Sequence, residues 1–197
     1  EEYKKLKEWL AYLSFQCRCY FRFAKGQAQL IYRADSISSS STITKNMIRM
    51  DGGTKKTTLR GPSPSPLENV INKISLHFDR DWDQSGENAY KNVTKTSNSA
   101  SISKYGEKEK PELFYFDFVT SNAMAASLAD FYLARNKDRK KDFSMECFLD
   151  NVDIEFAKGV TIQPAGNVLC EVQKVNIYPG SGRDKRNDRI TLYVREY

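Results

Sequence analysis

The apolar positions of the chain change their period along its length, and each change predicts a different element. In residues 3–13 they recur at spacings of three and four with lysine and glutamate between them, which predicts a short amphipathic helix. The positions on its apolar face are Tyr3, Leu6, Leu10 and Leu13. From residue 17 to residue 23 the period becomes two, and the turn "AKGQ" follows. This pattern predicts a β-hairpin that continues to Arg33.

The stretch between residues 36 and 66 has little periodicity. The segments "SISSSSTITK" (36–45) and "DGGTKK" (51–56) are typical of an exposed connection. The run "GPSPSP" (61–66) cannot continue a helix or a central strand, because proline lacks the backbone N–H that both require. We therefore expect a boundary near residue 60, with a small α+β lobe over residues 1–60 and a β-rich domain over residues 61–197.

Strand patterns dominate after that boundary. Ile74, Leu76 and Phe78 alternate with polar residues, and "AYKNVTKTS" (89–97) is expected to be the strand that returns. Further strands are predicted over residues 112–120, 143–149, 154–162, 168–178 and 189–195. The best helix spans residues 122–135, and Ser121 or Asn122 is expected to cap it. Its apolar stripe consists of Met124, Leu128, Phe131 and Tyr132, a spacing typical of core packing.

Composition supports a globular α+β fold. The 197 residues can bury a core, 40% of them are hydrophobic, and eleven tyrosines with eleven phenylalanines favour strands. We predict a mainly antiparallel β domain, a barrel or a sandwich, with one long helix and the small helix–hairpin lobe. No segment approaches the roughly 18 apolar residues of a membrane span, and no secretory leader is recognised at the start.

The cysteines are too irregularly spaced for a disulfide framework or a zinc site. They are Cys17, Cys19, Cys147 and Cys170. We interpret them as reduced, packed thiols, which favours synthesis in the cytoplasm.

The formal charge of +6 permits weak attraction to nucleic acid without requiring it. The basic runs "NKDRKKD" (136–142) and "GRDKRNDR" (182–189) both contain aspartate, whereas a phosphate-tracking surface is usually a cleaner basic face with aromatics. We interpret both runs as solvated loops, and nucleic acid is not expected to be a partner.

One stretch, "DRDWDQSGENAY" (79–90), resembles a calcium loop at first sight. A loop that starts at Asp81 matches an EF-hand at five positions: Asp81, Asp83, Ser85, Gly86 and Glu87. Position nine is Ala89 and position twelve is Asn92, so the bidentate carboxylate is missing. Asp, Ser and Gly are also the residues that turns select, and the stretch is predicted to be a polar hairpin turn.

Catalytic motifs are not evident. His77, the single histidine, lies in a strand pattern without a nucleophile motif, and we interpret it as structural. The carboxylate pairs Glu107 with Glu109 and Asp150 with Asp153 have the residue types of a glycosidase, but 25 acidic residues make such pairs inevitable. GxSxG, Walker and GxGxxG motifs are absent from the sequence. We predict no catalytic, cofactor-binding or metal-binding residues, and no enzyme.

Residues 99–162, from "SASISKYGEKEKPELFYFDF" to "EFAKGVTI", resemble the tail hub or tail tip proteins of bacteriophages and prophages. The matching positions are Ser101, Ile102, Tyr105, Gly106, Glu109, Leu128, Ala129, Leu133, Gly159 and Val160. The hairpin also resembles the family's strand at Gly26, Leu30 and Arg33, so the resemblance covers most of residues 20–197. One departure is that the acidic residue usual after the glycine of the family's turn is absent, because Val160 follows Gly159 directly.

The resemblance implies a structural role. Such hub or baseplate modules are barrels that form a ring, often a trimer, between the tail tube and the tip or fibre proteins. We therefore expect a virion tail protein that acts through contacts with other tail proteins and forms a homo-oligomer, with sheet edges and the loop 183–189 as surfaces. Tyr105, Gly106 and Leu128 are expected to maintain the fold, and the resemblance brings no catalytic residue.

The first alternative is a carbohydrate-binding or glycan-cleaving tail module, which needs a groove lined by aromatic residues. Trp9 and Trp82 are the two tryptophans, and Trp9 is expected to be buried by its helix. The second alternative, motivated by the formal charge of +6, is a basic nucleic-acid binder, whose binding would be lost across a modest salt series without sequence preference.

Overall fold

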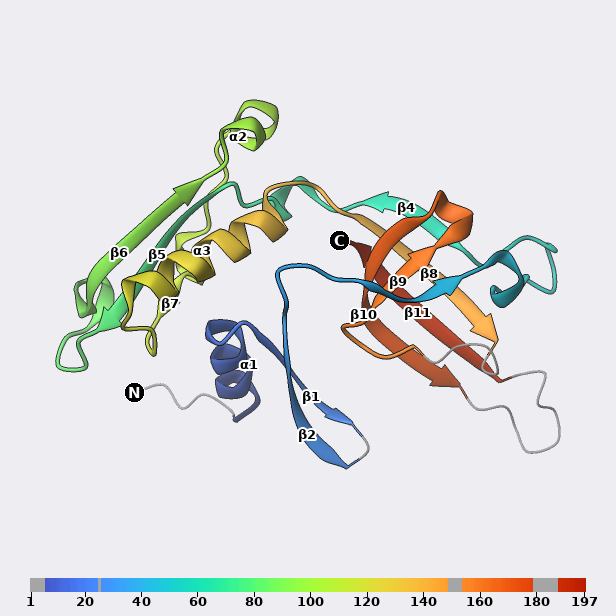
Figure 1. Ribbon diagram of the computed structural model, residues 1–197, viewed down its shortest axis with the longest axis horizontal. Helices are drawn as coiled ribbons and strands as arrows, with labels where there is room; N and C mark the ends of the chain where they lie inside the picture. Colours follow the sequence, from blue (N-terminus) through green and yellow to red (C-terminus); the bar gives the residue numbers. More distant parts are fainter. Residues whose placement is uncertain (1–5, 25, 149–153, 179–187) are drawn as a thin grey trace. The chain divides into compact units, whose positions relative to one another are not determined.

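The computed structural model describes residues 6–24, 26–148, 154–178 and 188–197, and they form two compact units (Figure 1). Unit 1 combines residues 1–35 with 66–139, and unit 2 combines residues 36–65 with 140–197. Unit 1 contains α1 (Leu6–Gln16), β1 (Cys19–Ala24), β2 (Gln27–Tyr32), β5 (Lys73–Arg80), β6 (Tyr90–Ser97), α2 (Ser99–Tyr105), β7 (Tyr115–Phe116) and α3 (Asn122–Asn136). Unit 2 contains β3 (Ser39–Ile43), β4 (Arg60–Pro64), β8 (Lys141–Phe148), β9 (Gly159–Ile162), β10 (Val168–Tyr178) and β11 (Arg189–Glu196).

This division differs from the predicted domains 1–60 and 61–197. Residues 36–60 belong with the C-terminal strands because β3 pairs with β9 and β4 pairs with β8. The proline-rich run does mark a change of unit, at Ser65–Pro66, but its first half forms β4. Proline is tolerated in β4 because this strand lies at the edge of the sheet. It pairs on one side only, so not every backbone N–H is needed for pairing.

Unit 2 is built on one six-stranded sheet in the order β3-β9-β10-β11-β8-β4. All neighbours are antiparallel except β3 and β9, which are parallel. The order ends in two different edge strands, so the sheet is not a closed barrel, and the barrel prediction is wrong in that respect. The α+β class with mostly strands is confirmed.

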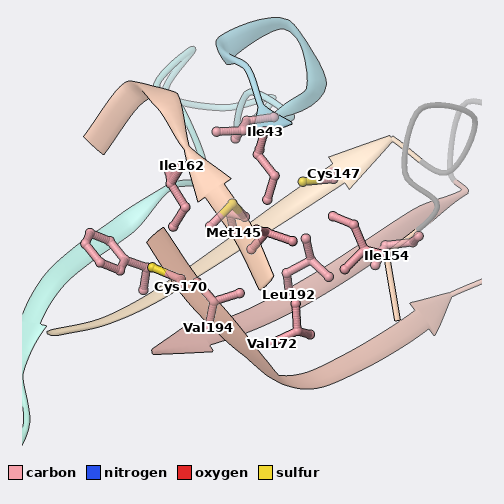
Figure 2. Close-up of a cluster of buried hydrophobic side chains, with 13 residues drawn as sticks. Ile43, Met145, Cys147, Ile154, Ile162, Cys170, Val172, Leu192 and Val194 are labelled. Atoms are coloured by element: carbon pink, nitrogen blue, oxygen red, sulfur yellow. The ribbon is translucent and has the colours of Figure 1, made fainter. Parts of the chain in front are cut away.

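The inner face of this sheet forms its own core (Figure 2). Its buried side chains come from β3, β8, β9, β10 and β11, with Ile48 and Ile154 from connecting segments. Since no described residue of this core comes from an α-helix or a second sheet, we infer that the sheet curls around its own apolar face. A register shift between Val172 and Lys174 in β10 is the kind of irregularity that increases such curvature.

The connection from β3 to β4 covers part of this core. Ile48 forms a bridge with Cys147 of β8, and the Arg49 N–H donates to the Glu146 carbonyl at 2.8 Å. The Thr58 N–H donates to the Arg49 carbonyl at 3.0 Å. Residues 39–43 of the expected exposed connection form β3: Ser39, Ser40 and Thr42 are exposed as expected, whereas Ile43 is completely buried.

Unit 1 contains a three-stranded sheet, β6-β5-β7, with α3 packed on it (Figure 1). Ile74, Leu76 and Phe78 are buried as predicted, and β6 returns antiparallel to β5 as predicted. The helix contributes Ala125, Leu128, Ala129, Phe131, Tyr132 and Leu133 to the same core. Met124, expected in the apolar stripe, is 55% exposed because it lies in the first turn, away from the sheet.

Several predicted elements differ in extent. The strand expected over residues 112–120 is reduced to β7, because residues 111–113 form a 3₁₀ turn and the chain turns again after Phe116. Of the helix expected over residues 3–13, residues 3–5 lie outside the described residues; the helix continues to Gln16, and Leu6 and Trp9 are exposed. Of the strand expected over residues 154–162, only β9 forms.

A helix that the periodicity did not predict, α2, follows β6. The Asn98 side chain caps it by accepting the Ser101 N–H at 2.9 Å, and Gly106 ends it with a φ of +73°. A positive φ is the conformation for which glycine is favoured at the end of a helix. With α1, α2 and α3, the described part of the chain has three α-helices rather than one long and one short helix.

Among the described residues, no helix is long and apolar enough to cross a membrane. Cys147 and Cys170 are buried in the core of unit 2, whereas Cys17 is exposed, so the prediction of packed thiols is wrong for Cys17.

Candidate functional site

The stretch first compared with a calcium loop connects β5 and β6, as the hairpin interpretation predicted. We call its residues 81–87 the acidic tip, and a 3₁₀ turn, Gly86–Ala89, begins within it. The Asp81 carboxylate accepts the Asp83 N–H at 3.2 Å and lies 3.6 Å from the Lys91 ammonium. In the described ranges no three His, Cys, Asp or Glu side chains gather as metal ligands would.

Aromatic side chains accompany these carboxylates. Trp82 is 60% exposed, its ring lies 5.9 Å from that of Phe118, and the Arg80 guanidinium lies 4.5 Å from the indole centroid. The acidic tip therefore presents carboxylates on both sides of an exposed tryptophan.

His77 packs between two tyrosines in unit 1. Its ring stacks on Tyr115 at 4.9 Å and approaches the edge of Tyr90 at 6.3 Å. Stacked aromatic rings contribute packing energy, which agrees with the structural interpretation of this histidine.

The carboxylate pair Glu107 and Glu109 is held by one lysine. The Lys73 ammonium lies 2.7 Å from Glu107 and 3.3 Å from Glu109. The Ser75 hydroxyl and Lys73 lower the pKa of Glu109, whereas a glycosidase acid needs a raised pKa. The other pair, Asp150 and Asp153, lies outside the described residues.

Asp117 is the most enclosed carboxylate of unit 1. It accepts hydrogen bonds from the Tyr90 hydroxyl at 2.5 Å and from the Arg80 guanidinium at 2.9 Å. Burial raises the pKa of Tyr90, and the hydrogen bond with Asp117 raises it further. A carboxylate satisfied by internal donors is a structural group that joins β5, β6 and the end of β7.

The residues that carry the sequence resemblance have structural positions. Gly106 ends α2, Leu128 is buried under α3, and Tyr105 is half-buried beside Lys104. Gly159, expected in a turn, instead begins β9, where its Cα faces the backbone of Ser38. The glycine is needed there for close approach of two strands and not for a turn.

A polar pocket of about 400 Å³ lies on the outer side of the unit 2 sheet. We call it the arginine pocket, because Arg49, Arg60 and Arg189 line it together with Asp51 and Glu146. The Arg189 guanidinium lies 3.7 Å from the Glu146 carboxylate. Sequence reasoning missed this pocket because its arginines lie far apart in the chain and only the pairing of β4, β8 and β11 brings them together.

A second pocket of about 390 Å³ also includes Arg49. It is more apolar, because Ile48, Met50 and Phe148 line it, and the Arg49 guanidinium lies 5.7 Å from the Phe148 ring centroid. The two pockets share Arg49 and Met50 in their linings, so the arginine pocket and the more apolar pocket are neighbours.

The β1–β2 hairpin pairs with no other strand in the described part of the chain. Its exposed apolar side chains are Phe23, Leu30 and Tyr32. Arg18 at its base is buried, with its guanidinium 3.7 Å from the Phe131 centroid and hydrogen-bonded to Asp35. The hairpin is thus attached firmly at its base and unpaired along both edges.

Comparison with solved structures finds a similar fold in a chain of a virion particle and in two tail proteins. The chain resembles one in the virion of a native gene transfer agent particle, with a TM-score of 0.65 and 9% identity over 95% of this chain. It also resembles a tail protein from Neisseria meningitidis MC58 (TM-score 0.59, 9% identity, 100% of this chain). A third is the 43 kDa tail protein of prophage MuSo2 from Shewanella oneidensis (TM-score 0.51, 12% identity, 98% of this chain).

The chain spans 38%, 56% and 53% of the length of these three proteins, respectively. No protein-family model matches the sequence, and no curated protein sequence matches it. At these identities the likeness establishes the shared fold.

Proposed function

We propose that this chain is a structural component of a phage, prophage or related particle tail. In this role it is a hub or tip domain that connects the tail tube to tip or fibre proteins through protein–protein contacts. It works without catalysis and as a homo-oligomer, with a trimer favoured. Its place of action is the virion tail, after synthesis in the bacterial cytoplasm.

The observation that carries the proposal is the fold. Nearly the whole chain, with both of its units, aligns with part of a chain from a gene transfer agent virion and with two tail proteins. The sequence motifs around Tyr105, Gly106 and Leu128 point to the same class of protein independently of that comparison.

The surface features of the described residues agree with a contact role. Unpaired strand edges occur in the hairpin, in β3 and β4 and in β6 and β7. Exposed sheet edges need cover, and a neighbouring protein is one way to supply it. The exposed apolar side chains of the hairpin would gain burial in such a contact.

A carbohydrate-binding role is the alternative, and one observation favours it. The exposed Trp82 and Phe118 rings lie together, as in aromatic platforms that stack on sugars. Binding to a glycan array that is lost on Trp82→Ala would support this role, and absence of any glycan signal would remove it. Cleavage gains no support from Glu107 and Glu109, which share Lys73.

Deletion of the gene in the bacterial strain that carries it tests the proposed function. We expect particles with missing, unattached or tip-less tails under the electron microscope, and normal tails when the gene is restored. Morphologically complete, infective or transducing particles in the deletion strain would overturn the structural role.

A further inference from the structure

The arginine pocket carries more positive than negative charge. Arg49, Arg60 and Arg189 face two carboxylates, those of Asp51 and Glu146, which leaves one net positive charge. The Asp51 carboxylate is already engaged by the backbone N–H groups of Gly53 and Thr54, both at 2.9 Å. The Glu146 carboxylate forms an ion pair with Arg189 at 3.7 Å, and among the described residues neither Arg49 nor Arg60 forms one with it.

Arg49 is incompletely satisfied. Its Nη1 atom is buried and has no hydrogen-bond partner among the described residues. A buried donor without an acceptor costs free energy, and Arg49 is one of the residues that line the pocket. Arg60, on the edge strand β4, lines the same pocket. The Thr54 and Gly53 N–H groups lower the pKa of Asp51 and the Arg60 charge lowers it further, but no ion pair of Arg60 occurs among the described residues.

The charge balance favours a carboxylate. A single negative charge neutralises the pocket, and the planar guanidinium fork matches a carboxylate with two hydrogen bonds. A phosphate dianion would bring a second charge close to Glu146. The neighbouring apolar pocket, which shares Arg49, favours an apolar or aromatic side chain next to that carboxylate in the sequence of the ligand.

The acidic tip of this same chain has that pattern, Asp81-Trp82-Asp83. Trp82 is exposed, and Asp83 has no side-chain partner within the described residues. The tip stands at the end of the long β5–β6 hairpin (Figure 1), so that another molecule can reach it. Its charge is opposite to that of the pocket.

We propose that the acidic tip of one copy of this chain docks into the arginine pocket of a second copy. The Asp83 carboxylate binds between Arg49 and Arg60, and the Trp82 indole enters the apolar pocket beside Phe148. This contact deepens the proposed structural role, on which it rests, by naming the surfaces through which copies join.

The contact is heterologous, since the two surfaces are different and each copy carries both. Copies therefore add head to tail, and a ring forms when the rotation between neighbours closes. Each copy in a chain of such contacts uses its tip on one side and its pocket on the other.

Two charge reversals, each in one half of the contact, test the proposal. Asp83→Lys reverses the charge at position 83 of the acidic tip, and Arg60→Glu reverses the charge at position 60 of the arginine pocket. Both positions are exposed, so we expect the variants to fold. The association constant is measured by analytical ultracentrifugation over a concentration series. We expect a wild-type chain that associates, and single variants whose association is weakened at least about 30-fold.

Mixing the two variants gives the sharper result. The tip of Arg60→Glu and the pocket of Asp83→Lys are both intact, so an equimolar mixture forms heterodimers. Growth beyond the heterodimer is expected to be weaker, because it would pair the lysine introduced at position 83 with the glutamate introduced at position 60, which has no guanidinium fork. The control Lys95→Glu, an exposed position on β6 with the same change of charge as Arg60→Glu, associates like the wild type.

Three results would overturn this contact: a mixture that stays monomeric, single variants that associate as well as the wild type, or a wild-type chain that is monomeric up to about 1 mM. None of these results bears on the tail role itself, which is decided by particle morphology in the deletion strain. Conversely, complete particles without the gene overturn the tail role even where the copies associate as proposed.

Discussion

Gly159 begins β9 at a point where two backbones nearly touch. A Cβ at this position would lie 2.2 Å from the Ser38 carbonyl oxygen and 2.9 Å from the Ile37 side chain. The glycine allows the parallel pairing of β3 with β9, and β3 contributes the buried Ile43 to the core. One small residue thus determines whether an edge strand can close over the core.

Gly159→Ala is expected to destabilise the protein by about 1–3 kcal/mol, because the strands must separate to admit the methyl group. Urea unfolding measures the change. Gly52→Ala is the matched control: its Cβ would meet nothing within 4 Å, so a change of less than about 0.5 kcal/mol is expected. Equal stability of the two variants would contradict the close approach.

Buried phenols and thiols make the fold sensitive to alkali. Burial raises the pKa of Tyr12, Tyr90 and Tyr132 above the ordinary value, and raises the pKa of Cys147 and Cys170 to about 12. A raised pKa in the folded state means that the folded protein holds the proton more tightly than the unfolded chain. This stabilisation is complete below the unfolded pKa and is lost as the pH rises above it.

We therefore expect the free energy of unfolding to fall as the pH rises above about 9, where unfolded cysteine and then tyrosine begin to ionise. Urea titrations between pH 8 and pH 11 measure this fall. Tyr90→Phe loses the hydrogen bond to Asp117 at every pH but should show a shallower decline above pH 10. A decline as steep as that of the wild type would show that Tyr90 does not contribute.

Among the helices and strands, the sequence pattern predicted those whose formation depends on residues nearby in the sequence. The hairpin 17–33, strand 74–78, its return strand, helix 122–135 and the strands that became β8, β10 and β11 are all present. The pattern could not predict β3, whose serine-rich sequence is polar and which forms because β9 pairs with it. It also missed α2, although Asn98 and Gly106 are a recognisable pair of capping residues.

The loop after α2 depends on one buried amide. Asn72 is completely buried; its Nδ2 donates to the Gly106 carbonyl at 2.8 Å and its Oδ1 accepts the Lys108 N–H at 2.8 Å. Its backbone carbonyl also accepts the Asn98 N–H. Asn72, directly before β5, thus holds together the residue that caps α2 and the segment that follows α2.

Asn72→Ala is expected to cost about 2 kcal/mol or more, because two backbone groups lose their partners in a buried place. Thermal unfolding measures the loss. The exposed Asn69, replaced by alanine, serves as the control and should change little. A loss that is the same for both variants would mean that the amide does not hold the loop.

At the scale of the whole molecule, the two units are interleaved in sequence. Residues 66–139 are inserted between two parts of unit 2, and the ends of the insertion are adjacent. The Ser65 N–H donates to the Lys140 carbonyl at 2.8 Å, and the Lys140 N–H donates to the Ser65 hydroxyl at 3.1 Å. Composition changes along the sequence predicted a single boundary near residue 60. They could not show that β3 and β4 pair with β9 and β8, which lie far later in the sequence.

Unit 2 should therefore fold alone when residues 36–65 are joined to residues 140–197 by a short Gly-Ser linker. We expect dispersed amide resonances and cooperative unfolding. The fragment 1–60, which separates β3 from β9, should be unfolded. A disordered unit 2, or a folded 1–60 fragment, would contradict the division into these units.

The central claim is that this chain is built into a tail. Its most direct test is the position of the protein in purified particles from the strain that carries the gene, with an epitope tag on the chain and gold-labelled antibody under the electron microscope. We expect label at the distal end of the tail tube, where hub and tip proteins lie. Label absent from the particles, or confined to the capsid, would contradict it.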